Sequence, residues 1–193
     1  MNLLPRAEPT FFGPQEHPLF GWLHRPDTPI GDLGLVICNP FGHEAQSIHR
    51  SLRHFAEASA AVGTPVLRFD YEGTGDSCGD ENDSARLAAW TQSVHRAVEA
   101  LREATGVTRV ALLGVRLGAL LAGLAAAERD DVDGLVLIAP VVAGKAWLRE
   151  MRALHGALAL SEPPRRCAAV TRRRPRSCRF FAVGGHASGA RGG

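Results

Sequence analysis

An arginine between two glycines is the residue whose type and spacing raise the question of chemistry. Arg116 follows Gly114 by two residues and precedes Gly118 by two, in the stretch LLGVRLGALLAG over residues 112–123. The apolar residues before Arg116 predict a buried strand, and those after it predict a helix, so Arg116 would lie in a tight strand-to-helix turn. A guanidinium stays protonated and only donates hydrogen bonds, so Arg116 cannot be a nucleophile. It can bind an anion such as a carboxylate or a phosphate.

The position of Arg116 at the start of a helix makes a neighbouring anion desirable. A cation there faces the positive end of the helix dipole, which is unfavourable by about 0.3–1 kcal/mol. The sequence offers Glu44, Asp70 or an external ligand as the compensating anion. Two interpretations stay open: a structural ion pair with Glu44, or a site where Arg116 and backbone N–H groups hold a carboxylate or phosphate ligand.

The elements that would position this turn alternate between strand and helix. Strands are expected over residues 18–26 (as an early edge strand), 33–38, 65–70, 109–114 and 134–140. Helices are expected over residues 47–62 (with Ser47 as a cap), 84–105 (ended by Gly106), 117–128 and within 141–160. Solid apolar strands alternating with helices indicate an α/β fold, a doubly wound and mostly parallel sheet covered on both faces.

Two further motifs follow predicted strands directly. NPFGHE covers residues 39–44, and RFDYEGTGDSCG covers residues 68–79. In this order with LLGVRLGALLAG, they resemble the α/β-hydrolase superfamily, in its serine-aminopeptidase-like and esterase-like branches. A looser likeness is to bacterial exosortase-associated hydrolases, some of which also carry arginine in this turn. The resemblance covers roughly residues 15–150.

The resemblance assigns roles to particular positions. It implies a nucleophile elbow centred on Arg116, with Gly114 and Gly118 as the small flanking residues. It implies an oxyanion hole formed by the backbone N–H of Leu117 and that of Phe41 or Gly42, and two such donors usually contribute most to acyl transfer. The D-x-x-G-x-G-x-S loop of these families is matched by Asp70, Gly73, Gly75 and Ser77.

The function implied by the resemblance is an acyl, ester or peptide hydrolase. Arg116 replaces the elbow serine, and no acid or histidine further along the chain can be assigned to the remaining triad positions, so catalytic activity stays in question. The alternative is a non-catalytic module of the same fold that binds an anion or a partner. Such a chain would bind a small acyl, ester or anionic ligand, and a protein partner would cover an incomplete sheet.

Charge divides the chain into an acidic body and a basic tail. Residues 161–193 hold eight arginines and one acid, a formal charge of +7, which leaves −5 for residues 1–160. We expect an α/β-hydrolase-like domain over residues 1–160, with its C-terminal part truncated or replaced, and a disordered Arg/Gly/Pro-rich tail over residues 161–193. The tail has no nucleic-acid-binding motif and few aromatic residues, so specific nucleic-acid binding is not expected.

Cysteine spacing and hydropathy set the remaining expectations. The four cysteines (Cys38, Cys78, Cys167 and Cys178) form no C-x-x-C pair and no zinc pattern, so we expect free thiols and neither metal nor cofactor. Residues 1–15 lack a secretory pattern, and the most apolar helix is too short to span a bilayer. The sequence therefore predicts a cytoplasmic protein without membrane contact.

Overall fold

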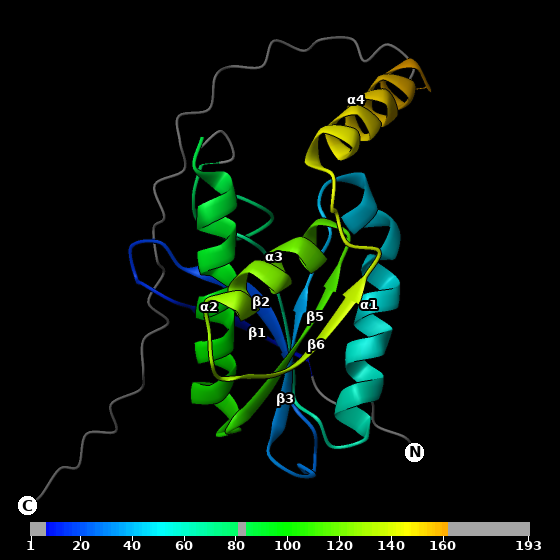
Figure 1. Ribbon diagram of the computed structural model, residues 1–193. Helices are drawn as coiled ribbons and strands as arrows, with labels where there is room; N and C mark the ends of the chain where they lie inside the picture. Colours follow the sequence, from blue (N-terminus) through cyan, green and yellow to red (C-terminus); the bar gives the residue numbers. More distant parts are fainter. Residues whose placement is uncertain (1–6, 81–83, 162–193) are drawn as a thin grey trace, which may run out of the picture. The chain divides into compact units, whose positions relative to one another are not determined.

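Six strands build one mixed sheet. The computed structural model describes residues 7–80 and 84–161. The strands are β1 (Ala7–Phe12), β2 (Leu19–His24), β3 (Leu33–Cys38), β4 (Val66–Phe69), β5 (Arg109–Val115) and β6 (Val132–Ile138). Their spatial order is β1-β2-β4-β3-β5-β6 (Figure 1). β2 is antiparallel to both β1 and β4, and the four strands from β4 to β6 are parallel.

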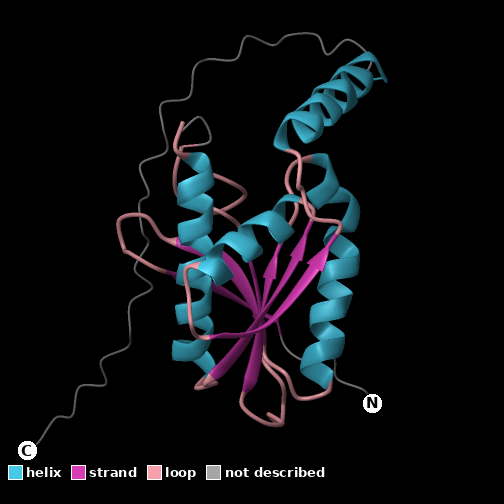
Figure 2. Ribbon diagram, viewed as in Figure 1, coloured by secondary structure: helices cyan, strands magenta, loops and turns pink. Residues whose placement is uncertain are grey.

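Helices cover both faces of the sheet, as Figure 2 shows. α1 (His43–Ala61) packs on one face, and α2 (Arg86–Thr105) and α3 (Leu117–Ala127) pack on the other. α4 (Gly144–Ser161) extends away from the sheet. Neighbouring residues of β5 face opposite cores: Leu112 packs in the same cluster as Val94 of α2 and Leu121 of α3. Leu113 instead packs in the cluster that contains Leu52 of α1. This two-sided burial confirms the doubly wound, mostly parallel α/β fold expected from the solid apolar strands.

The winding of the chain changes direction at β3. The connection from β3 to β4 runs through α1, on one face of the sheet. The connections from β4 to β5 and from β5 to β6 run through α2 and α3, which pack on each other on the opposite face. The chain therefore leaves β3 toward one face and leaves both of its neighbours, β4 and β5, toward the other. Open α/β sheets bind ligands at the carboxyl ends of strands where connections diverge in this way.

The structure differs from the expected elements at β1, at β2 and at the start of α1. The strand expected at the sheet edge is β2, which is internal because it bonds to β1 on one side and β4 on the other. The edge strand is β1, which sequence reasoning missed: it contains Glu8 and Pro9, and its ordering depends on cross-strand contacts such as Phe11 against Phe20. The first helix begins at His43, with Gly42 as its N-cap, and the Ser47 hydroxyl donates to the His43 carbonyl instead of capping.

The opposite edge of the sheet exposes apolar side chains. β6 pairs with β5 on one side, and within the described residues no strand pairs with its other side. Its residues Leu135, Val136, Leu137 and Ile138 are 41–50% exposed. Because successive residues of a strand point to opposite faces, both faces of β6 are incompletely covered.

Several expectations concern cysteines, membranes and the tail. Cys38 is a buried free thiol, and burial raises its pKa to about 12, whereas Cys78 is disulfide-bonded. The expectation of free thiols is therefore confirmed for Cys38 and wrong for Cys78.

Within the described ranges, no helix combines the length and apolar character needed to cross a bilayer. The expected basic tail, with Cys167 and Cys178, lies outside the described residues beyond Ser161.

Candidate functional site

The turn between β5 and α3 holds Arg116 in a backbone conformation that side chains rarely adopt. Its φ is 55° and its ψ is −115°. The Arg116 N–H donates to the Ile138 carbonyl at 2.9 Å, and its carbonyl accepts from the Val141 N–H at 3.3 Å. Such conformations persist only where surrounding structure enforces them. The end of β6 and the segment after it supply that enforcement.

The glycines on either side of Arg116 are required by close backbone contacts. A Cβ at Gly114 would lie 2.5 Å from the Cα of Ala119, and a Cβ at Gly118 would lie 2.1 Å from the carbonyl oxygen of Cys38. Both distances are far below van der Waals contact. Side chains at either position would therefore force the backbone of the turn apart.

The Arg116 guanidinium joins three elements through two carboxylates. Its Nε donates to Glu44 Oε1 in the first turn of α1 at 2.7 Å, and one Nη donates to Glu150 Oε2 on α4 at 2.9 Å. The hydrogen bond to Glu44, followed by that to Glu150, raises the pKa of Arg116 further above its ordinary value. Of the anions expected beside Arg116, Glu44 is its partner. Sequence reasoning missed Glu150, because nothing local indicates that α4 returns to the turn.

The expected oxyanion donors lie at the same edge of the sheet. Leu117 is the first residue of α3, where a backbone N–H has no acceptor within its own helix. Phe41 and Gly42 precede α1, and Gly42 has a φ of 62°. Because Gly118 lies against the Cys38 carbonyl, the start of α3 packs on the carboxyl end of β3, from which the Phe41–Gly42 segment emerges.

The D-x-x-G-x-G-x-S loop is held by its own motif residues. Asp70 Oδ2 accepts the Asp76 N–H at 3.1 Å, and burial raises the pKa of the Asp70 carboxyl. A Cβ at Gly75 would lie 2.1 Å from that Oδ2. The Ser77 hydroxyl donates to the Asp70 carbonyl at 2.6 Å and accepts the Phe20 N–H at 2.9 Å. These contacts anchor the loop to β2 and make Ser77 a loop-bracing residue.

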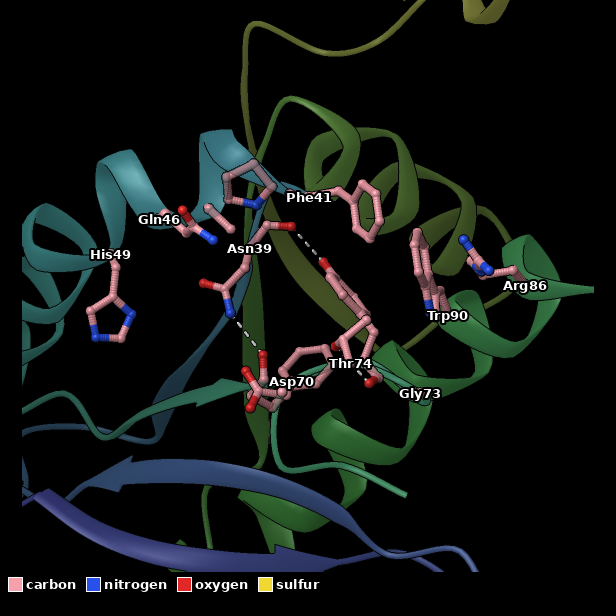
Figure 3. Close-up of a pocket in the computed structure, with 15 residues that line it drawn as sticks. Asn39, Phe41, Gln46, His49, Asp70, Gly73, Thr74, Arg86 and Trp90 are labelled. Atoms are coloured by element: carbon pink, nitrogen blue, oxygen red, sulfur yellow. Dashed lines mark hydrogen bonds between the residues drawn. The ribbon is translucent and has the colours of Figure 1, made fainter. Parts of the chain in front are cut away.

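A cavity of about 1040 Å³ opens at the carboxyl ends of β3 and β4 (Figure 3). Four aromatic side chains contribute to its wall, those of Phe41, Phe69, Tyr71 and Trp90. Figure 3 shows Arg86 beside Trp90 at one end, and Gln46 and His49 at the other. Its polar lining also includes Asp70 and Thr74.

Only part of the expected site lines this cavity. Phe41, Gly42, Asp70, Gly73 and Gly75 do so, whereas Gly114, Arg116, Leu117, Gly118 and Ser77 do not. Sequence reasoning missed Arg86 and Trp90, which it treated only as part of an amphipathic helix. The available signal was topological, because α2 begins after β4, beside the carboxyl end of β3.

No group of three or more His, Cys, Asp or Glu side chains arranged to hold a metal ion occurs in the part of the chain that the structure describes.

Comparison with known families identifies the class of protein. The model of the family Serine aminopeptidase, S33, matches residues 35–175, which is more than half of the chain. The chain belongs to this family, within the α/β-hydrolase superfamily. The match includes all three motifs, the last four residues of β3 and all of α4. A comparison with curated proteins finds no match.

Solved structures share the fold at low identity. An esterase from Pyrococcus furiosus has a TM-score of 0.60 and 17% identity, with 83% of this chain and 57% of that chain covered. An α/β serine hydrolase without a lid from Xanthomonas campestris has a TM-score of 0.58 and 22% identity, covering 70% and 62%. Est1E of Butyrivibrio proteoclasticus, solved with ferulic acid bound, has a TM-score of 0.56 and 26% identity, covering 68% and 52%. This chain thus spans 52–62% of the length of these three proteins.

Proposed function

We propose that this chain is a non-catalytic, ligand-binding member of the α/β-hydrolase superfamily, with no covalent acyl transfer at residue 116. The observation that carries the proposal is Arg116 at the centre of a glycine-flanked strand-to-helix turn, the place of the nucleophile in this superfamily. A guanidinium has no electron pair to offer a carbonyl carbon and remains protonated. The scaffold of a nucleophile elbow is therefore kept without a nucleophile.

The contacts of Arg116 favour the structural ion pair over an anion site. Glu44 and Glu150 together with Arg116 carry a formal charge of −1, so an incoming anion would meet excess negative charge. The guanidinium also uses two of its donors on these carboxylates. In this proposal Arg116 positions the turn relative to α1 and α4, and the ligand binds elsewhere at the carboxyl edge of the sheet.

The cavity beside β3 supports ligand binding at that edge. Its volume of about 1040 Å³ is at the upper end of small-molecule pockets, and it combines aromatic walls with a few polar groups. Phe41 and Gly42, the candidate oxyanion donors, are shared between this cavity and the segment next to the turn. A small acyl or aryl compound fits this combination of groups.

Ester hydrolysis and active-site labelling test the proposal together. The full chain is incubated with p-nitrophenyl acetate and butyrate, with aminoacyl p-nitroanilides, and with a fluorophosphonate probe followed by peptide mass spectrometry. We expect no turnover above buffer and no adduct in residues 112–123. The variants Arg116→Ala and Arg109→Ala are run in parallel, since Arg109 pairs with Asp133 at the amino end of β5, away from the turn.

Enzymatic turnover by the wild-type chain would overturn the proposal, whether or not Arg116→Ala retains it. Rates of the order of 1 s⁻¹ or more are typical of enzymes and are easily separated from buffer hydrolysis. A fluorophosphonate adduct within residues 112–123 would overturn it independently, because such an adduct requires a nucleophile in the turn.

A further inference from the structure

The cavity lies at a divergence point of the fold that differs from the one occupied by Arg116. The turn after β5 lies beside the carboxyl ends of β3 and β5, whereas the cavity lies at the carboxyl ends of β3 and β4. The segments after β3 and β4 leave for opposite faces, toward α1 and α2, and their first residues line the cavity. The cavity therefore meets the general condition for ligand binding in open α/β sheets.

Arg86 brings a cation to the cavity. It is the first residue of α2, is half-buried, and has its guanidinium carbon 5.5 Å from the centre of the Trp90 ring. Its Nε is buried and has no hydrogen-bond acceptor among residues 7–80 and 84–161. Arg96 of the same helix, by contrast, pairs with Glu72 at 3.2 Å. A buried donor without an acceptor costs about 1–3 kcal/mol, so this guanidinium calls for an acceptor.

The aromatic residues around Arg86 offer rings without free polar atoms. Tyr71 donates its hydroxyl to the Asn39 carbonyl at 2.9 Å, and Trp90 donates its indole N–H to the Glu72 carbonyl at 2.9 Å. The Phe41 ring, half-buried, lies with its centre 5.0 Å from that of Trp90. Rings with satisfied polar groups favour an apolar or aromatic body in the ligand.

We propose that this cavity binds a small-molecule carboxylate with an aromatic or apolar body, whose carboxylate pairs with Arg86 while the body packs against Phe41 and Trp90. A single guanidinium matches the two oxygens of a planar carboxylate in a bidentate arrangement. A doubly charged phosphate is disfavoured, because Asp70 lines the same cavity. The inference rests on the proposed function only in taking the ligand to be bound and not covalently processed at residue 116.

Calorimetric titration of the full chain with matched probes tests the inference. The probes are 3-phenylpropionate, its uncharged amide, and phenyl phosphate. We expect the carboxylate to bind wild type, and Arg86→Gln to weaken that binding by roughly tenfold or more, as loss of a charged hydrogen bond implies. The amide should bind wild type and Arg86→Gln equally weakly. Arg109→Gln, which removes a surface arginine at the amino end of β5, should change neither affinity.

A second variant keeps the test decisive if Arg86→Gln fails to fold in a thermal melt. Phe41→Ala should weaken the carboxylate and the amide by similar factors, because it removes ring contact and leaves the charge in place. Failure of wild type to bind 3-phenylpropionate at millimolar concentration, equal binding by wild type and Arg86→Gln, or tighter binding of phenyl phosphate would each overturn the inference. Ester turnover by wild type would overturn the proposed function but not this inference, because binding of the carboxylate at Arg86 is measured in a separate experiment.

Discussion

A buried histidine should make this fold sensitive to mild acid. His24 on β2 is fully buried, and its Nε2 accepts a hydrogen bond from the Nε of Arg68 on β4 at 3.1 Å. Burial first, and the Arg68 charge second, lower the pKa of the His24 imidazole from 6.5 to about 4. Arg53 lowers this pKa further, and Glu57 raises it. The folded state therefore holds His24 neutral throughout the mildly acidic range.

The size of the effect follows from the difference between the two pKa values of His24. Above pH 6.5 the imidazole is neutral in both the folded and unfolded chain, and the full stability is present. As pH falls below 6.5, the unfolded chain binds a proton that the folded chain binds only near pH 4, so stability is lost across that window. At about 1.4 kcal/mol per pH unit, the total loss is about 3 kcal/mol, of which about 2 kcal/mol falls between pH 7 and pH 4.5. This is a large fraction of the 5–15 kcal/mol typical of a domain.

Urea unfolding, followed by far-ultraviolet circular dichroism at pH 7, 5.5 and 4.5, measures the loss. The control is His24→Gln, because glutamine offers Arg68 an acceptor oxygen and does not titrate. The pKa of Asp131 is lowered, chiefly by its hydrogen bond from Arg129. Titration of this carboxylate therefore reduces stability only below about pH 3.8, outside the measured range. The pKa of Asp70 is raised in the folded chain, so its titration increases stability as pH falls, opposite to the effect of His24. This contribution is the same in wild type and in His24→Gln. Equal loss of stability in wild type and His24→Gln would refute the reasoning.

Further predictions concern the turn, α4 and the buried thiol. Gly118→Ala should lower the free energy of unfolding in urea by about 3 kcal/mol, because the new methyl group meets the Cys38 carbonyl. Gly123→Ala on the same helix places its methyl group in open space and should be neutral or stabilising. Equal effects of the two substitutions would contradict this prediction. Glu150→Gln should change stability by less than about 1 kcal/mol, since Glu150 is 59% exposed, yet should speed amide exchange in α4 measured by mass spectrometry. Unchanged exchange would show that Arg116 does not hold α4. The Cys38 thiol, with its pKa raised to about 12 by burial, should resist iodoacetamide at pH 8 until the chain unfolds, and rapid native alkylation would count against its burial.

Apolar periodicity predicted most of the elements that hold the site. The solid apolar run of β5, the continuously apolar α3 and the amphipathic α2 each carry their signal within a few residues. Gly106 ends α2 with a left-handed φ of 75°, as its position after the last apolar residue predicts. These features are local, so a single sequence is enough to find them.

The missed elements lack such local signals. β1 is a short edge strand whose residues are only partly buried, and pairing with β2 accounts for its formation more than its own composition does. The start of α1 has no side-chain cap, since Gly42 at the N-cap has none to offer, and the more capping-prone Ser47 misled the prediction. Tertiary packing overrides propensity at such positions.

What the sequence by itself determined is the chemical identity of the turn: two glycines that permit it, and an arginine that cannot attack a carbonyl. Only the tertiary structure decided which carboxylates neutralise that arginine, because Glu44 and Glu150 lie 72 and 34 residues away along the chain. The same holds for the cavity, where Phe41, Arg86 and Trp90 meet. The order of the strands places β3 next to β4 and sends their following segments to opposite faces, and that arrangement brings residues from separate parts of the chain around one space.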